Sequence, residues 1–562
     1  MSKKHLGGFM IKSPRNCIIV SVLTLLTLFF STTIYTSAEN DSSGSEKKAA
    51  PTKPLFSSYD EGSAGLSISE HFYFLGIADM HVDTGRETKP MEIDPSSIET
   101  GTPRKNDADE KTFNKMLGTI KNAISTRRMI KKPDFIIVLG DLASHNRCKE
   151  LAPDDLKKLS IDAVKEHLKN CQKITYATEI KNNEDIIKRN VTEISRDEET
   201  VFKTLGETFK DIPIFYVFGN NDGLRLVEGP FKDDTINDLK GPDLPESPYE
   251  IATKKGGWKN GFLSTGLICG DPLLVPCIDP IDIKDDDNSG STTFGYYSAH
   301  LKPKLKLVAI NSMLFSANPK NKAPEDQADK QLAWLEKQLA SAHDKKESVI
   351  IATHIPFGKN VFDKGRKYLK EPYQTKLNDL VVKYSKNITG IICGHVHYEE
   401  LKIMESQKGL EEIIISIPAM STAEGNAPGI KEFHLTKGAF PYLSEAGPWK
   451  IDNYQTLSFV KEEGLLTLNR LYNFKDYYCP NNKIDDIKEL DICNLDAPIE
   501  TKIAEQYTMG NPHLDEKKLN PVIGGVFIEI QEKVKEGFRK LGTFFAKIQF
   551  SSLLDTLATF YS

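Results

Sequence analysis

Five short clusters of potential metal ligands stand out in this chain of 562 residues. Each cluster directly follows a run of apolar, largely β-branched residues, which is typical of a buried strand in a helix-covered sheet. The clusters are Asp79-Met80-His81, Gly140-Asp141 with His145, Gly219-Asn220-Asn221-Asp222, Thr353-His354 and Gly394-His395-Val396-His397. Carboxylate, amide and neutral imidazole groups bind divalent ions such as Zn, Mn or Fe. The chemistry that these residues indicate is metal-assisted hydrolysis.

The apolar runs before the clusters predict the strands that must position these side chains. The predicted strands span 71–78, 135–139, 214–218, 348–352 and 388–393. Open α/β sheets place their sites at the carboxyl ends of the strands. We therefore expect the five clusters to meet at one rim.

The residue types allow a division of ligands between two ions. Two divalent ions about 3.5–4 Å apart need a shared anionic ligand, and Asp141, in a tight Gly-Asp turn, is the predicted bridge. The remaining ligands are predicted to be Asp79, His81 and His397 for one ion, and Asn220, His354 and His395 for the other. A hydroxide shared by the ions would be the nucleophile, because coordination lowers the pKa of water to about 7.

The order of the clusters resembles that of the calcineurin-like metallophosphoesterases, over roughly residues 69–436. The run from Gly140 to His145 is similar to a turn of the acid sphingomyelinase-like branch, although many other members carry Asp at the Ser144 position. The runs 79–83 and 219–222 resemble the endopolyphosphatases within that branch. The resemblance implies an α/β four-layer sandwich, in which two mixed β-sheets are flanked by helices. It also implies a hydrolase of phosphoric esters or phosphoanhydrides.

One position departs from the family pattern. Most members have His where Asn221 stands, and that His is thought to protonate the leaving group or to steady the transition state. An amide cannot act as an acid, but it can donate a hydrogen bond to a phosphoryl oxygen. The titratable candidate is His145, because an imidazole can supply a proton at moderately acidic pH. His145 and Asn221 are thus the predicted catalytic residues, with a supporting role for His145 as the alternative.

Several substrates remain open on the sequence. The pattern is most like the sphingomyelinase-type phosphodiesterases, and the alternatives are an endopolyphosphatase and a nucleotide or phosphomonoester phosphatase. The expected partner is a phosphate-containing small molecule, a lipid head group or polyphosphate. A net charge of −6 with mixed signs argues against a nucleic-acid partner. From a different class, the chain could be a catalytically dead phosphoesterase-like binding module.

The first 38 residues predict export, to a secreted, periplasmic or lumenal destination. A basic start precedes a largely apolar stretch, 17–34, and small residues up to Ala38 offer a cleavage site. This segment is either a cleaved signal peptide or a membrane anchor, since its length is near the lower limit for a spanning helix. Residues 39–68 follow as a flexible spacer.

Cysteine usage agrees with an oxidising compartment. Six cysteines fall into three locally spaced pairs, and they allow fifteen connectivities, so the pairing is a hypothesis. The pairs are Cys148 with Cys171, Cys269 with Cys277, and Cys479 with Cys493. Cys393 lies within a predicted strand and is expected to be a buried free thiol.

The catalytic domain is predicted to span 69–475, with an irregular insertion at about 229–291 that would help to choose the substrate. Helices are expected within 104–129, 154–169, 180–209 and 331–339, and two strands within 454–474. Residues 476–562 form a C-terminal extension predicted to be mostly helical. An apolar stripe from Phe527 to Ile548 favours a helix packed on the domain, with an amphipathic helix that contacts a membrane as the alternative.

Overall fold

The structure is a computed structural model. It describes residues 70–84, 107–145, 183–254, 277–278 and 294–495 with short internal gaps, and Lys502. The predictions for the signal segment, the spacer, the helix at 154–169 and the C-terminal amphipathic stripe lie outside these residues.

The first sheet carries three of the five clusters at the ends of adjacent parallel strands. Its order is β15-β14-β13-β1-β4-β5, with β1 at Glu70–Ile77, β4 at Phe135–Val138, β5 at Ile214–Tyr216, β13 at Gly429–Lys437, β14 at Trp449–Glu462 and β15 at Leu465–Asn473. β1, β4 and β5 are parallel neighbours, whereas β13 runs antiparallel to β1. The predicted strands at 71–78, 135–139 and 214–218 are confirmed, and the predicted pair within 454–474 extends the sheet as β14 and β15.

The second sheet carries the other two clusters. Its order is β11-β12-β10-β9-β8-β7-β6, with β6 at Cys277–Ile278, β7 at Tyr297–Lys302, β8 at Leu305–Ile310, β9 at Ser348–Thr353, β10 at Ile388–Cys393, β11 at Leu401–Ser406 and β12 at Gly409–Ser416. β9 and β10 are parallel neighbours, and every residue of both is buried. Continuous burial explains why their sequences are apolar without alternation.

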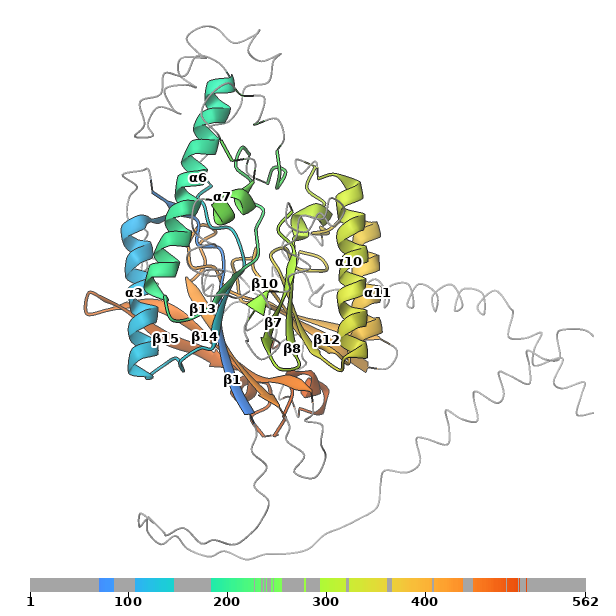
Figure 1. The fold of residues 1–562 in the computed structure, drawn as a ribbon. Helices are drawn as coiled ribbons and strands as arrows, with labels where there is room; N and C mark the ends of the chain where they lie inside the picture. Colours follow the sequence, from blue (N-terminus) through green and yellow to red (C-terminus); the bar gives the residue numbers. More distant parts are fainter. Residues whose placement is uncertain are drawn as a thin grey trace, which may run out of the picture. The chain divides into compact units, whose positions relative to one another are not determined.

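Helices cover the outer face of each sheet, which gives four layers (Figure 1). The helices on the two outer faces are α3 (Glu110–Thr126), α6 (Asn183–Thr208), α10 (Glu325–Asp344) and α11 (Glu371–Tyr384). α3 begins at a capping aspartate, since the Asp109 side chain accepts a hydrogen bond from the Thr112 amide. The predicted sandwich of two mixed sheets flanked by helices is confirmed. The described part of the insertion at 229–291 includes one short helix, α7 (Pro248–Lys254), and the short strand β6.

The two sheets are joined by hydrogen bonds as well as by apolar packing. At the start of β14, the Trp449 amide donates to Ser348 Oγ on β9 at 2.8 Å. The Trp449 carbonyl accepts from Thr389 Oγ1 on β10 at 3.1 Å. These bonds hold the second sheet against the long strand β14 of the first.

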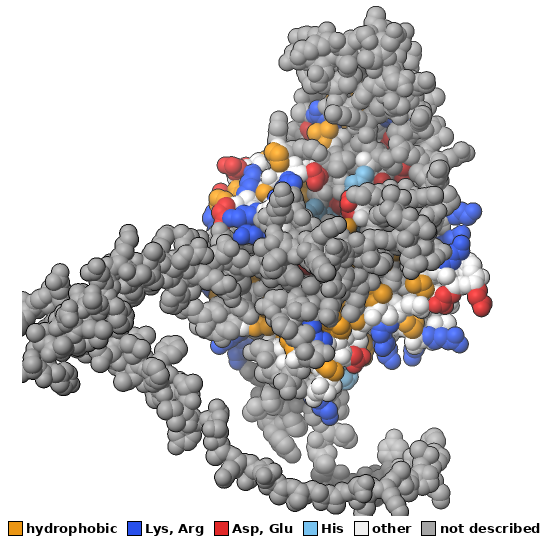
Figure 2. All heavy atoms as spheres, turned by 180° about the vertical axis from the view of Figure 1, so that it is seen from behind, with side chains coloured by type: hydrophobic (Ala, Val, Ile, Leu, Met, Phe, Trp, Pro, Cys, Tyr) orange, Lys and Arg blue, Asp and Glu red, His pale blue; other side chains and the backbone are white. Residues whose placement is uncertain are grey.

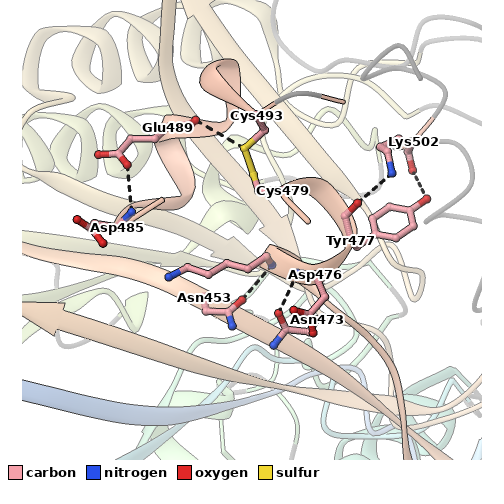
Figure 3. Close-up of a disulfide and its surroundings, with 10 residues drawn as sticks. Asn453, Asn473, Asp476, Tyr477, Cys479, Asp485, Glu489, Cys493 and Lys502 are labelled. Carbon is pink, nitrogen blue, oxygen red and sulfur yellow. Dashed lines mark hydrogen bonds between the residues drawn. A yellow bond between two sulfur atoms is a disulfide. The ribbon is translucent and has the colours of Figure 1, made fainter. Parts of the chain in front are cut away.

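After β15, a disulfide-linked segment packs on the sheets. α12 (Phe474–Tyr478) and η4 (Ile487–Ile492) are connected by the bond between Cys479 and Cys493, as Figure 3 shows. The predicted pairing of these two cysteines is confirmed, and Cys393 is a buried free cysteine as expected. Of the other two predicted pairs, three cysteines lie outside the described residues and the side chain of Cys277 is not described.

The described surface carries charges of both signs. On the face drawn in Figure 2, basic, acidic and hydrophobic side chains of the described residues lie mixed together. This agrees with the mixed charge of the sequence.

A contact between Lys488 and the buried Glu412 fixes η4 to the second sheet. Lys488 Nζ lies 3.0 Å from Glu412 Oε2, and Glu412, on β12, is fully buried. Burial raises the pKa of Glu412 to about 7 from its ordinary 4.5. The folded protein therefore holds a proton on Glu412 at pH values where the unfolded chain has lost it. The stabilisation that this proton confers is complete below pH 4.5 and is lost as the pH rises through 7.

We expect Glu412→Gln to flatten this pH dependence. Between pH 5 and pH 8 the free energy of unfolding of the unchanged protein should fall more steeply than that of the variant, by on the order of 1 kcal/mol per pH unit at most. Urea unfolding at several pH values measures the slopes. Glu336→Gln, at an exposed ion pair with Lys383, is the control and should keep the original slope. Parallel curves for Glu412→Gln and the unchanged protein would contradict the prediction.

Candidate metal centre

The seven predicted ligands lie together at the carboxyl ends of strands from both sheets. Asp79 and His81 follow β1, Asp141 follows β4, and Asn220 follows β5. The remaining three come from the second sheet, His354 directly after β9, and His395 and His397 after β10. All but His395 are almost completely buried.

The ligands form two groups that share one carboxylate. Within each group the potential ligand atoms lie within 4.8 Å of one another. The groups are Asp79, His81, Asp141 and His397 on one side, and Asp141, His354 and His395 on the other. Asn220 joins the second group, because its Oδ1 lies 2.8 Å from His354 Nε2. This is the division made from the sequence, with Asp141 common to both sets, although the role of each residue stays a prediction.

Asp141 lies between two imidazoles. Its Oδ2 is 3.6 Å from His81 Nε2, and its Oδ1 is 3.2 Å from His354 Nε2. The other nitrogen of each ring is held by a backbone carbonyl, with His81 Nδ1 3.2 Å from the Ala143 oxygen and His354 Nδ1 2.6 Å from the Leu139 oxygen. Hydrogen bonds of this kind fix the tautomer, so that Nε2 can present its lone pair to a cation.

Five of the seven ligands have a left-handed backbone, which few non-glycine residues adopt. The φ angles are 50° for Asp79, 44° for His81, 52° for Asp141, 70° for His395 and 66° for His397. These residues stand just past the ends of β1, β4 and β10, where the ligands lie. Such conformations cost about 1–3 kcal/mol each and persist where surrounding structure imposes them.

Glycines beside the ligands allow the strand ends to approach closely. A Cβ atom on Gly219 would lie 2.1 Å from Asp141 Oδ1, and one on Gly394 would lie 2.8 Å from Asp79 Oδ2. Gly140, at φ 85°, lies against the Gly219 backbone. Any larger residue at Gly219 would displace the shared carboxylate.

Asp222 is a positioning residue, a role that was not predicted for it. Its carboxylate accepts hydrogen bonds from the backbone amides of Gly219 (2.6 Å), Leu142 (2.6 Å) and Asp141 (3.1 Å). It therefore ties the turn after β5 to the turn after β4. Its place in the run Gly219-Asn220-Asn221-Asp222 was a usable signal, because Asp commonly bonds nearby amides in turns.

The buried charges perturb one another strongly. Burial, together with the negative charge of Asp141, raises the pKa of Asp79 well above its usual value. Burial raises the pKa of Asp141 as well, but His354 and His81 outweigh it and hold that pKa well below its usual range. Burial lowers the pKa of His354, yet Asp141 and Asp79 raise it to about 9. The cluster thus attracts positive charge.

The donor set fits a pair of divalent cations. Burial lowers the pKa of His81 and lowers that of His397 to about 3, so both rings are neutral at pH 7. Their Nε2 atoms lie only 3.2 Å apart, and His397 Nε2 is 3.5 Å from Asp79 Oδ1. Two neutral imidazole nitrogens directed at the same point beside carboxylate oxygens are an arrangement that a cation stabilises. Nitrogen and oxygen donors of this kind fit Zn, Mn and Fe alike.

His145 and Asn221 lie beside this centre. Asn221 donates to Asp141 through its amide nitrogen (2.7 Å) and through Nδ2 (2.8 Å), and Nδ2 is also 3.3 Å from His145 Nε2. The His145 ring stacks on His81 with centroids 3.9 Å apart, and its side chain is 32% exposed. His145 is thus the more accessible of the two predicted catalytic side chains.

Asp107 was not predicted from the sequence. Its Oδ2 accepts from the His145 amide at 2.8 Å, and its Oδ1 lies 2.8 Å from His145 Nδ1. The carboxylate orients the ring and directs Nε2 toward Asn221. No local pattern marks this residue, because it stands 38 positions before His145 in the chain.

A buried cluster of His and Asp at the strand ends of two packed sheets defines the metal-dependent phosphoesterases. A sequence profile described as calcineurin-like phosphoesterase matches residues 72–399, which is more than half of the chain. The chain belongs to the calcineurin-like phosphoesterase family.

Several proteins with similar sequences are named as phosphodiesterases. The Bos taurus protein named cyclic GMP-AMP phosphodiesterase SMPDL3A is 29% identical over 226 residues, which are 38% of this chain and 46% of that protein. A Dictyostelium discoideum protein named sphingomyelinase phosphodiesterase D is 34% identical over 107 residues, which are 18% of this chain and 23% of that protein. The chain spans less than half the length of these relatives.

Among solved structures, a dimetal phosphatase from Danio rerio is similar at 12% sequence identity. The match covers 67% of this chain and 98% of that chain, with a TM-score of 0.33. As for membrane contact, no helix within the described residues has the length and apolar character needed to cross a bilayer. The predicted anchor at 17–34 is not among them.

We expect Gly219→Ala to impair metal binding, because the new methyl group would overlap Asp141 Oδ1. Metal analysis after dialysis against a limiting concentration of Zn or Mn should find clearly fewer ions per protein than in the unchanged chain. Gly118→Ala, in α3, is the matched control, since no atom lies within 4 Å of its added Cβ. The prediction is wrong if a folded Gly219→Ala protein retains the full metal content.

Proposed function

We propose that the chain is a dinuclear-metal hydrolase that cleaves a phosphoric ester or phosphoanhydride bond. The observation that carries the proposal is the position of Asp141, which lies between His81 and His354 and belongs to both groups of ligands. One ion would be held by Asp79, His81 and His397, the other by Asn220, His354 and His395, and both by Asp141. When bound, such ions supply an activated water and neutralise charge on the phosphoryl group.

His145 and Asn221 are proposed to handle the leaving group and the phosphoryl oxygens. With Asp107 at Nδ1, the imidazole presents Nε2 toward the centre, so that a proton on Nε2 can pass to the departing oxygen. The Asn221 amide has hydrogen atoms to donate but no proton to transfer, so it is suited to hold a phosphoryl oxygen. The two residues together replace the single His that most of the family has at the position of Asn221.

Export remains part of the proposal. It is supported by the basic and then apolar N-terminal sequence and by the disulfide between Cys479 and Cys493. Disulfides persist in oxidising compartments and are rare in the cytosol.

A product-release assay tests the activity and its substrate, with phosphocholine measured for sphingomyelin, phosphate for polyphosphate and nucleotides, and p-nitrophenol for bis-p-nitrophenyl phosphate. The panel contains sphingomyelin, polyphosphate, nucleotides and bis-p-nitrophenyl phosphate, each with Zn, Mn or Mg added back. Sphingomyelin cleavage would support the sphingomyelinase-type prediction, which agrees with the name of the Dictyostelium discoideum relative. Polyphosphate cleavage would support the endopolyphosphatase alternative. Asp141→Asn should lose turnover of every substrate together with bound metal. Purified protein that binds no metal and hydrolyses nothing would instead be a binding module with a dead site.

The acid role of His145 makes a separate prediction about leaving groups. His145→Ala should slow esters with alkyl leaving groups by about 100- to 10,000-fold, because an alkoxide needs a proton in order to depart. p-Nitrophenyl esters should lose far less, since p-nitrophenolate leaves unprotonated. Asp107→Asn should show the same preference with a smaller loss, and His343→Ala, exposed on α10, should change neither rate. Equal losses for both kinds of ester would remove the acid role.

A further inference from the structure

A small polar pocket opens beside the candidate metal centre. Its volume is about 160 Å³, and it shares Asn220 and His395 with that centre. Pockets that enclose a whole drug-sized ligand are larger, at roughly 300–1,000 Å³. This pocket therefore accommodates one group of a substrate whose reacting phosphorus lies at the centre.

Three segments from different parts of the chain form its walls. Glu228, after β5, donates its amide to the Asn220 carbonyl at 3.1 Å. Asn318, after η3 (Ser312–Phe315), donates Nδ2 to the Glu228 carboxylate. The third wall, at Arg366 to Tyr368, pairs with the second through the bond from the Ala317 amide to the Tyr368 carbonyl, at 2.9 Å. The pocket is thus built by connected backbone.

The charge of the lining favours an anion. Arg366 and Lys367 supply two positive charges, and Glu228 is the one acidic side chain among the described residues that line the pocket. Lys367 also pairs with Glu371, which does not line the pocket, so Arg366 is the main cationic group for an anion. Asn318 already donates to Glu228. Arginine and lysine side chains with nearby amide donors are the groups that bind phosphate in proteins.

The aromatic ring in the pocket is not placed to bind a cation. Quaternary ammonium groups are recognised by the faces of aromatic rings. Tyr368 is the aromatic residue among the described lining residues, and Lys402 Nζ lies over its ring, 4.6 Å from the centroid. His395 meets the same ring edge-on at 5.4 Å. A trimethylammonium group would face Lys402, Arg366 and Lys367 rather than an aromatic cage.

We infer that this pocket binds a second phosphate group of the substrate, so that the enzyme prefers phosphoanhydride chains or nucleoside polyphosphates to phosphocholine lipids. The inference rests on the proposed function, because it places the scissile phosphate at the metal centre. The adjacent phosphate of the same molecule then lies against Arg366 and Lys367. It deepens the proposal by choosing among the substrates that the sequence left open.

Binding of non-hydrolysable probes tests the inference without turnover. In calorimetric titrations of the metal-loaded full chain, methylenediphosphonate should bind at least 10-fold more tightly than phosphocholine. The double variant Arg366→Gln/Lys367→Gln should bind the diphosphonate at least 10-fold more weakly than the unchanged chain. Glu228→Gln should act in the opposite direction and tighten binding several-fold, because it removes the negative charge. A parallel titration with α,β-methylene-ADP distinguishes a nucleotide from a bare polyphosphate by whether the nucleoside adds affinity.

Lys370→Gln is the matched control, since Lys370 precedes α11 and does not line the pocket. It should bind the diphosphonate as the unchanged chain does. Arg366 is exposed and Lys367 is 34% exposed, so the double variant should fold normally, which its thermal midpoint would verify.

Unchanged diphosphonate binding in the double variant, or a preference for phosphocholine, would overturn the inference. These outcomes are separate from the fate of the proposed function. A protein that binds as expected but hydrolyses no substrate keeps the pocket and loses the catalytic proposal. If the protein hydrolyses substrates of the panel but the double variant still binds the diphosphonate fully, the catalytic proposal stands and the phosphate pocket is refuted.

Discussion

The concentration of negative charge in the interior is the constraint on which the rest of the site depends. Asp79, Asp141 and Asp222 are all buried, and they raise one another's cost of ionisation. A buried carboxylate is stable only with hydrogen bonds or opposite charge around it. Backbone amides solvate Asp222, imidazoles surround Asp141, and the His395 amide donates to both oxygens of Asp79 at 3.0–3.1 Å. The left-handed turns and the close glycine contacts are the means by which the backbone supplies these partners.

The five strands before the clusters could be predicted from local patterns, and the meeting of the ligands followed from the rule that sites lie at the carboxyl ends of strands. Runs such as Ile388–Cys393 are apolar since both faces of their sheet are covered, and the polar residue after each run marks the rim. The same patterns say nothing about φ, so the strained backbone at Asp79 or His397 could not be foreseen. Asp107 was missed for another reason. Its contact with His145 depends on how the segment before α3 packs on the turn after β4. Such a tertiary contact leaves no periodic pattern in the sequence.

Because Asn221 stands where most of the family has His, two functions that one His can combine fall to two residues. In this chain the hydrogen-bond donor and the titratable group are separate residues, held 3.3 Å apart and supported by different carboxylates, Asp141 and Asp107. The donor is buried against the shared ligand, while the imidazole remains partly exposed. The polar pocket lies on the other side of the centre, against Asn220 and His395. If the proposed roles of His145 and of the pocket hold, proton transfer and substrate selection would concern opposite groups of ligands.

The predicted ligands of each ion come from both sheets, since β1, β4 and β5 belong to one and β9 and β10 to the other. A cation held between Asp79 and His397 would cross-link the two sheets, since these residues are 318 positions apart in the chain and follow strands of different sheets. Ligands that bind only the folded state raise its stability, and the gain grows with the logarithm of the ratio of free concentration to dissociation constant. Metal binding would then raise the free energy of unfolding of the protein as well as make it active. The enzyme's resistance to unfolding and to proteases would rise and fall with the trace-metal content of its surroundings.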